Sequence, residues 1–252
     1  FGQFHRLLVL GERWRGLFRD FGLAMPIEVC PSTFRREVLE RAADFTRGPR
    51  GERAARILFV GQVGRRKGVL DLIEALRRVR ADGLALELTV VGPAQAEGEL
   101  DAARAAAVAA GLGDAARFTG ALTGDALYAE FREHEVFALP SYNEGIPAVL
   151  YEAGAFQMAL VTTPVGGIPD LVRHESNGLL VEPGDVPALA AALARLAHDP
   201  GLAVRLAARL REDVLAFHPD RVSERMARAV ADECAILGLS VAPARAPAVE
   251  RR

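Results

Sequence analysis

From residue 57 onward, short apolar runs alternate with segments whose apolar residues recur at helical spacing. The apolar runs cover residues 57–60, 86–91, 136–139, 160–163 and 179–181. The helical patterns lie near residues 67–80, 98–111, 124–133, 147–157, 186–198 and 200–216. Strands that are apolar throughout, each followed by a helix, are typical of a parallel sheet that helices cover on both faces. The pattern predicts an α/β domain, which binds ligands at the carboxyl ends of its strands.

The first 50 residues do not follow this rhythm. They contain two short extended runs, at 7–10 and 27–31, and between them a predicted helix that carries Trp14, Phe18 and Phe21. The charged, turn-rich stretch 48–52 reads as a linker. A domain boundary is therefore expected near residue 50.

The last part of the chain also differs from the middle. Residues 219–238 show one more amphipathic helical pattern, and from residue 240 the sequence is an Ala/Pro/Arg tail with little to bury. We therefore predict a domain over 51–238 and a disordered tail over 239–252.

One strand-to-helix connection carries two glutamates. The apolar run 136–139 ends in Pro-Ser, Glu144 lies in the following loop, and Glu152 lies eight residues further on, in a predicted helix. Pro147 suits the first turn of that helix, because its missing N–H costs nothing there. The free N–H groups at such a helix start favour a phosphate, with one carboxylate at the mouth of the site and one on its wall.

A second connection, from Gly61 to Gly68, is rich in glycine and basic residues. Glycine lets the backbone approach a phosphate closely, and Lys67 supplies a positive charge. The segment is neither a Walker loop nor a GxGxxG motif. Taken alone, a basic glycine turn of this kind is more often a solvated loop.

Together these motifs resemble the retaining glycosyltransferases of family 4, which have the GT-B fold. The resemblance rests on the spacing of Glu144 and Glu152, on the Gly61–Gly68 loop, on VGGIPD at 165–170 and on NGLLVEPGD at 177–185. It covers roughly residues 55–235. It implies a Rossmann-like domain, the C-terminal half of a GT-B enzyme, that moves a hexose from a UDP- or GDP-sugar to an acceptor hydroxyl with retention, in bacterial polysaccharide or glycolipid synthesis.

The resemblance also assigns roles to individual residues. It implies the donor diphosphate for Lys67, Gln62 and Gly61, the donor sugar for Glu144, Gly145, Ile146 and Pro147, the ribose for Glu152, and the base for Leu122. The chain departs from the family pattern at Gln62, where the family often has Arg, so that Arg65 or Arg66 is left to supply the charge. It departs again at 156–159, where the family usually has small residues with Gly and Pro.

In this family the acceptor pocket and the catalytic residues belong to the N-terminal domain. The resemblance therefore implies that residues 1–50 are a remnant of that domain, and we nominate no catalytic residue in this chain. The isolated chain is expected to bind donor without transferring sugar. No metal or cofactor is expected, because Lys67 and helix-start N–H groups can stabilise a leaving diphosphate.

Composition excludes several other classes of function. A net charge of −2 over 252 residues gives no electrostatic reason to expect nucleic acid. Cys30, Cys234 and the five histidines show no metal-ligand spacing, and no apolar run is long enough for a membrane span. We expect the protein in the cytoplasm, either free or at the inner face of the membrane. A GT-B-fold nucleotide-sugar epimerase and a non-catalytic nucleotide-binding module remain as alternatives. A two-carboxylate glycosidase is disfavoured, because nothing else in the sequence shapes a sugar-hydrolysing cleft.

Overall fold

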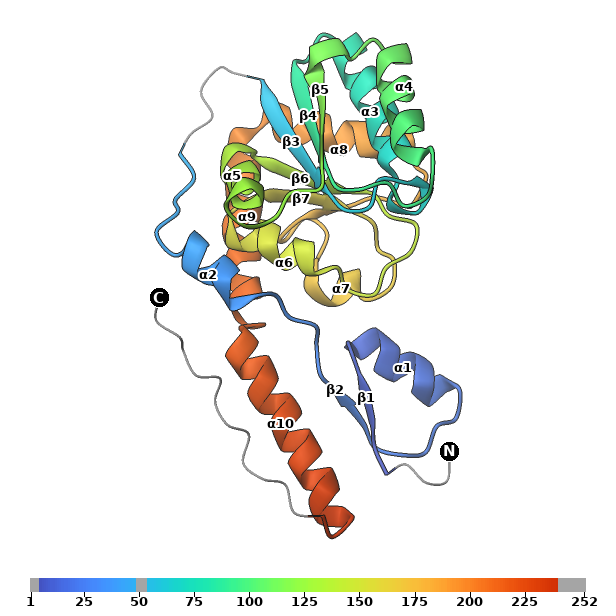
Figure 1. Ribbon diagram of the computed structural model, residues 1–252, viewed down its shortest axis with the longest axis vertical. Helices are drawn as coiled ribbons and strands as arrows, with labels where there is room; N and C mark the ends of the chain where they lie inside the picture. Colours follow the sequence, from blue (N-terminus) through green and yellow to red (C-terminus); the bar gives the residue numbers. More distant parts are fainter. Residues whose placement is uncertain (1–4, 49–53, 240–252) are drawn as a thin grey trace.

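A six-stranded parallel sheet forms the centre of the computed structural model, which describes residues 5–48 and 54–239 (Figure 1). The strand order is β5-β4-β3-β6-β7-β8, so the direction of sheet growth reverses between β3 and β6. The strands are β3 (Ala55–Val60), β4 (Leu86–Val91), β5 (Ala116–Gly120), β6 (Val136–Leu139), β7 (Ala159–Thr162) and β8 (Leu179–Leu180). The predicted parallel α/β sheet is confirmed. Strand β5 was absent from the apolar runs because it is an edge strand whose residues are only partly buried.

Helices cover this sheet on both faces. Helix α3 packs against α4 and α8, and Figure 1 shows α3 and α4 on one side of the sheet with α5 on the other. Helix α6 packs against α9, which also contacts β7. The helices are α3 (Val69–Ala81), α4 (Glu99–Ala109), α5 (Gly124–Glu133), α6 (Ala148–Ala155), α7 (Ile168–Leu171), α8 (Val186–His198) and α9 (Pro200–Leu215). Two 3₁₀ turns, η1 (Arg65–Lys67) and η2 (Gly113–Ala115), complete this unit.

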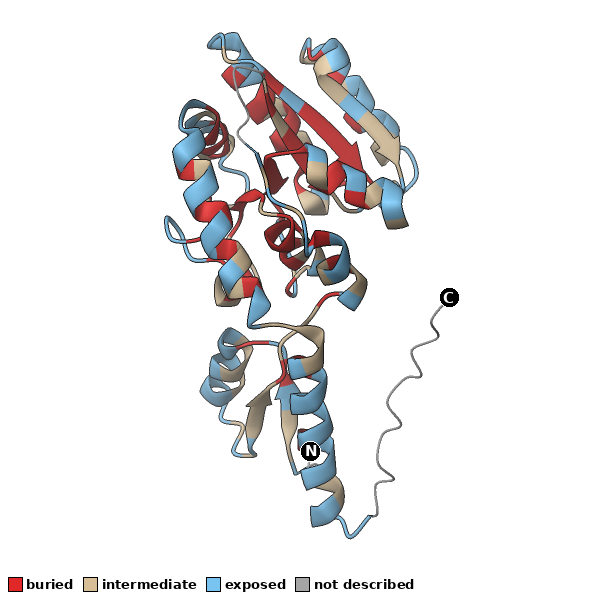
Figure 2. Ribbon diagram, turned by 90° about the vertical axis from the view of Figure 1, so that its left-hand side faces the viewer, coloured by how far each residue is buried: buried red, intermediate tan, exposed pale blue. Residues whose placement is uncertain are grey.

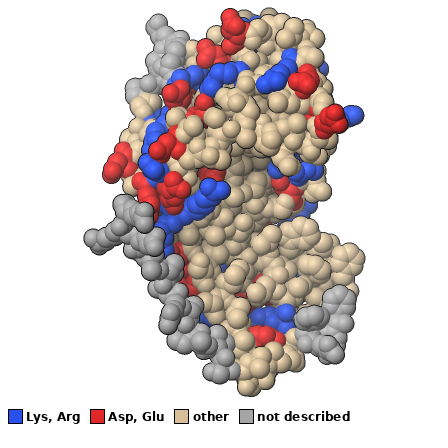
Figure 3. Space-filling view, in the orientation of Figure 1, with Lys and Arg blue, Asp and Glu red and all other residues tan. Residues whose placement is uncertain are grey.

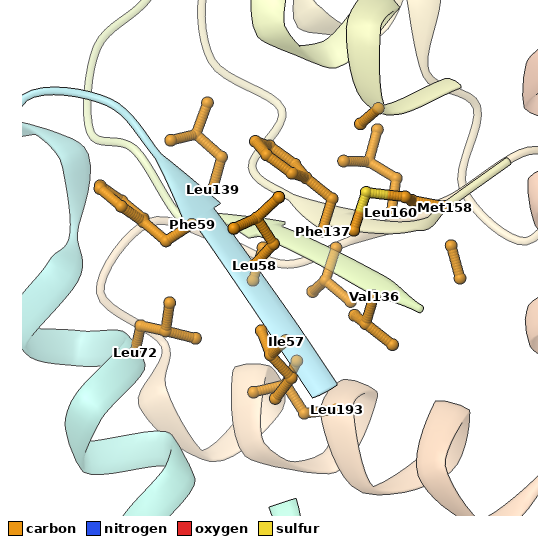
Figure 4. Close-up of a cluster of buried hydrophobic side chains, with 14 of the residues drawn as sticks. Ile57, Leu58, Phe59, Leu72, Val136, Phe137, Leu139, Met158, Leu160 and Leu193 are labelled. Carbon is orange, nitrogen blue, oxygen red and sulfur yellow. The ribbon is translucent and has the colours of Figure 1, made fainter. Parts of the chain in front are cut away.

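The core lies between the sheet and these helices. Neighbouring residues of β3 point to opposite faces of the sheet, so Ile57 and Phe59 lie on the side of Leu72 in α3 and Leu193 in α8 (Figure 4). Leu58 packs on the opposite face, and all five side chains are buried. Complete burial of an aliphatic or phenyl side chain of this size contributes about 1.5–3 kcal/mol. The central strands are therefore the most strongly fixed part of the molecule, and they anchor the loops at their carboxyl ends.

A smaller unit contains the first part of the chain and the last helix. Strands β1 (Leu7–Val9) and β2 (Ile27–Val29) pair in parallel on either side of α1 (Glu12–Asp20). Helix α10 (Pro219–Ile236) lies beside them in both ribbon views (Figures 1 and 2). Arg6 joins Glu28 at 2.6 Å and approaches Glu233 of α10 at 4.0 Å. The two strands are mostly half-buried and α10 is largely exposed (Figure 2).

The chain crosses between the two units twice, once after β2 and once between α9 and α10. The two crossings touch: the Thr33 hydroxyl donates to the Phe217 carbonyl at 2.8 Å. Tyr151 of α6 packs between them, with ring-centroid distances of 5.7 Å to Phe34 and 5.2 Å to Phe217. After the first crossing, α2 (Arg36–Ala42), a helix that the apolar pattern did not indicate, packs against α6.

Several boundaries differ from the predictions or lie beyond what is described. Of the predicted linker, only Gly48 belongs to the described residues, and the predicted tail lies outside them from residue 240 onward. The domain division near residue 50 stays a prediction.

Phe21 is 77% exposed, whereas Trp14 and Phe18 are half-buried. On the face in Figure 3, basic and acidic side chains are intermixed. Within residues 5–48 and 54–239, none of the helices has the length and hydropathy to span a bilayer.

Candidate functional site

The loops that follow β3 and β6 meet at the point where the strand order reverses, and a buried ion pair joins them. Lys67 Nζ lies 2.5 Å from Glu144 Oε1, and these side chains are only 13% and 6% exposed. The Ser141 hydroxyl donates to the same oxygen at 2.8 Å. In open α/β sheets, ligands bind at this reversal point, outside the carboxyl ends of the strands. The sequence placed Lys67 and Glu144 in one site, and the structure brings them into direct contact.

The loop that carries Glu144 is packed against the loop after β7. Gly166 has φ of +56°, and a Cβ there would lie 1.7 Å from the Glu144 carbonyl oxygen. The Gly167 N–H donates to the Gly145 carbonyl at 2.7 Å. The Thr163 hydroxyl donates to the Ser141 carbonyl at 2.6 Å. The difference from the family pattern at 156–159 therefore does not disrupt these contacts. The VGG segment packs against the loop that carries Glu144 and supports it.

Glu152 lies in α6 with different neighbours. Burial raises the pKa of its carboxyl group, and the charge of Arg35 opposes that shift. Its charge also contributes to raising the pKa of Tyr128 in α5. Glu152 is half-buried, and its carboxylate makes no hydrogen bond or ion pair with the described residues. A carboxylate in this state gains free energy when hydroxyl donors reach it.

The predicted diphosphate residues other than Lys67 lie around the end of β3. The Gly61 N–H donates to the Val91 carbonyl at 2.9 Å. A Cβ on Gly92 would lie only 1.8 Å from the Gly61 carbonyl oxygen, so the two backbones are in close contact. Gln62 is exposed, and its Oε1 accepts a 3.3 Å hydrogen bond from Arg66. A Cβ at Gly61 would lie 3.9 Å from Lys67 Cδ, so Gly61 lies beside the ion pair.

The remaining predicted residues present backbone rather than side chains. Gly145 is exposed, whereas the Ile146 side chain is buried against Gly167. Pro147 is the residue before the first turn of α6. Leu122 packs partly against the core in the short loop between β5 and α5. Only the backbone groups of Ile146 and Leu122 are suited to reach a ligand.

The smaller unit reaches the same edge of the sheet. The Arg13 guanidinium donates to the Pro164 carbonyl at 3.0 Å. Burial raises the pKa of the Asp170 carboxyl group, and the nearby backbone N–H groups of Arg13 and Glu12 oppose that shift. A Cβ at Gly11 would lie within 2 Å of this carboxylate. The sequence singled out the segments that contain Asp170 and Ser141 but gave these residues no role, because their contacts join distant loops.

The NGLLVEPGD segment has a structural role. The buried Asn177 side chain donates to the Leu171 carbonyl at 3.0 Å and to Asp213 at 2.7 Å. Asp185 caps α8 by accepting the Ala188 N–H at 2.9 Å.

Among the described residues, no three His, Cys, Asp or Glu side chains lie close enough to hold a metal ion. A cavity of about 560 Å³ lies near the amino ends of β6 and β7, and none of the predicted site residues lines it.

Comparison with known proteins agrees with this arrangement. The family described as "Glycosyl transferases group 1" matches residues 40–213. The D-inositol 3-phosphate glycosyltransferase of Salinispora arenicola is 38% identical over 176 residues, which is 68% of this chain and 39% of the relative. The amylovoran biosynthesis glycosyltransferase AmsK of Erwinia amylovora is 36% identical over 148 residues, 56% of this chain and 35% of the relative. The chain thus spans well under half the length of these two relatives.

Solved structures show the same fold. HepE from Anabaena, determined in complex with UDP, superposes with a TM-score of 0.77 at 17% identity, over 90% of this chain and 64% of that protein. Such a likeness establishes the arrangement of the sheet and helices. The chain has the α/β architecture of GT-B glycosyltransferases.

Proposed function

Because this chain belongs to the glycosyl transferases group 1 family, we propose that its larger unit binds a UDP- or GDP-sugar as the donor of a sugar transfer. In the whole protein, the sugar passes to an acceptor hydroxyl with retention, in the synthesis of a polysaccharide or glycolipid. The relatives carry the names of transferases, which gives no support to an epimerase or a non-catalytic module.

The observation that carries this proposal is the buried Lys67–Glu144 pair at the reversal point of the sheet. Both Lys67 and Ser141 bond Oε1 of Glu144, so Oε2 has no partner among the described residues. In the proposed complex, Oε2 accepts a hydroxyl of the donor sugar while Lys67 faces the adjoining diphosphate. As the diphosphate departs, its charge grows, and a fixed cation in a partly dehydrated site stabilises that charge.

Glu152 supports the assignment of the ribose. Its half-buried carboxylate has no hydrogen-bond partner among the described residues, and its charge acts on Tyr128 of α5, the helix that begins just after Leu122. We propose that Glu152 accepts the two ribose hydroxyls and that the backbone around Leu122 contacts the base. Since a backbone contact carries no side-chain signature, UDP and GDP both remain in the proposal.

Calorimetric titration of the chain with UDP and with GDP tests this proposal. We expect one of them to bind, and Lys67→Ala to weaken binding by about 1.5–3 kcal/mol, the range for a hydrogen bond to a charged group. The double variant Lys67→Ala/Glu144→Gln is the matched control, because the single variant also leaves Glu144 buried and unpaired. The single variant should bind more weakly than the double. Absence of binding to both nucleotides by folded wild-type protein would refute the proposal.

A further inference from the structure

The proposed site contains a charge imbalance. Lys67 is paired with Glu144 at 2.5 Å, so the cation nearest the reversal point is already neutralised. A nucleoside diphosphate carries more than one negative charge. If it bound beside this pair alone, it would meet no net positive charge, and Glu144 would repel it. Another cation must therefore face the ligand.

Arg66 lies at the required place. It is the middle residue of η1, and its guanidinium bridges the loops after β3 and β6, donating to Gln62 Oε1 and to the Asn143 carbonyl, each at 3.3 Å. Both acceptors are neutral. In the part of the chain that the structure describes, Arg66 forms no ion pair with a carboxylate, so its charge is uncompensated.

The backbone fixes where this side chain begins. The Tyr142 N–H donates to the Arg66 carbonyl at 2.9 Å, which holds η1 against the loop after β6. Arg66 itself is half-buried. A guanidinium has five N–H donors in a fixed fork, and two long hydrogen bonds leave most of them free for a phosphate.

The neighbouring Arg65 differs in its exposure and in its side-chain contacts. Its side chain is exposed and makes no hydrogen bond to Gln62 or Asn143. Its backbone N–H donates to Glu99 Oε1 at 3.3 Å, and its charge acts on Tyr142. Both arginines line the cavity beside Tyr142 and Asp71, but Arg65 makes neither of the contacts that join Arg66 to the loops after β3 and β6.

We propose that Arg66 binds the donor diphosphate and supplies the charge that the Lys67–Glu144 pair lacks. Gln62 acts as a positioning residue: it holds the guanidinium through a neutral oxygen and leaves its charge available. On binding, long hydrogen bonds to neutral acceptors give way to charge-assisted ones with phosphate oxygens, which are stronger. This inference rests on the proposed function, because it names a further residue of the same site.

The test compares Arg66→Gln with Arg65→Gln in the full chain. Both remove one positive charge, but only the first removes it from the proposed site. We measure the affinity for UDP and GDP by calorimetry, and that for uridine and guanosine by ligand-observed NMR. We expect Arg66→Gln to weaken diphosphate binding about ten- to a hundredfold, to leave nucleoside binding unchanged, and to reduce the salt dependence of the affinity. Arg65→Gln should change the affinity by less than about twofold, since exposed charges interact weakly.

A second variant separates charge from loop structure. The double variant Gln62→Arg/Arg66→Gln exchanges the two side chains of the Arg66–Gln62 contact, so the positive charge moves to position 62. We expect diphosphate affinity to recover to within a fewfold of wild type. Equal effects of Arg66→Gln and Arg65→Gln would overturn the inference while leaving the proposed function intact. A parallel loss of nucleoside binding, with no rescue by Gln62→Arg, would also overturn it, because Arg66 would then only brace the loops. If wild-type protein binds neither nucleotide, the proposed function falls and this inference with it.

Discussion

Substitution of Gly166 by alanine should displace the loop that carries Glu144 and lower the stability of the protein. Gly166 has φ of +56°, and a Cβ there would lie 1.7 Å from the Glu144 carbonyl oxygen and 2.9 Å from that of Gly145. Adopting the left-handed region costs an L-residue about 1–2 kcal/mol. Moving the Glu144 loop away also breaks the Gly167–Gly145 hydrogen bond, which contributes about 0.5–1.5 kcal/mol. We therefore expect Gly166→Ala to lower the free energy of unfolding by about 1.5–3.5 kcal/mol.

The matched control is Gly113→Ala. Gly113 has φ of +50°, and a Cβ there would meet nothing within 4 Å, so this variant carries only the conformational cost. Urea unfolding should be followed by far-ultraviolet circular dichroism, because the single tryptophan, Trp14, lies in the smaller unit. Gly166→Ala should also weaken binding of UDP or GDP, whereas Gly113→Ala should leave it unchanged. Equal losses of stability and unaltered nucleotide binding would refute the packing argument.

Three further substitutions test other parts of the structure. Arg47→Lys should lower the free energy of unfolding by about 1.5–3 kcal/mol, because one ammonium cannot replace the guanidinium bonds to the Phe156 and Gln157 carbonyls, both 2.8 Å; urea unfolding measures it. Glu152→Gln should stabilise the free protein at neutral pH and have little effect well below pH 4.5. The pKa of Glu152 is raised from 4.5 by burial, so the folded state holds its proton more tightly and loses stability as pH rises; thermal unfolding against pH checks this. Tyr151→Phe should leave the protein as stable or about 1 kcal/mol more stable, since the buried hydroxyl has no partner among the described residues; thermal unfolding at one pH decides.

The sequence was a good guide to the central strands and their helices. Residues 136–139 are apolar without interruption and buried, and residues 86–91 are apolar except at Glu87 and Thr89, of which only Glu87 is exposed. The structure gives strands of the same bounds. Strand β5 and helices α2 and α7 carry weaker patterns. One is a half-buried edge strand, and the two helices are only one or two turns long, too short to show a helical period.

The site was predictable as a set of loops but not as a set of contacts. Periodicity placed Lys67 and Glu144 at strand ends, but their ion pair joins residues 77 positions apart and depends on β6 returning beside β3. Gln157 is a similar case. Its φ of +54° is a conformation in which glycine is usual, and its carbonyl and amide oxygens both accept from Arg47, a contact that no local pattern reveals.

The two chain segments that connect the units are hydrogen-bonded to each other at Thr33 and Phe217, and this contact restricts how the smaller unit can rotate. A unit joined by a single segment of chain can rotate in any direction. A unit joined by two adjacent segments rotates most easily about the line that connects them. Rotation about the line through these points separates Arg13 from the Pro164 carbonyl and the start of α1 from Asp170 in a single motion. A change in the angle between the units would therefore break both contacts at the carboxyl edge of the sheet together.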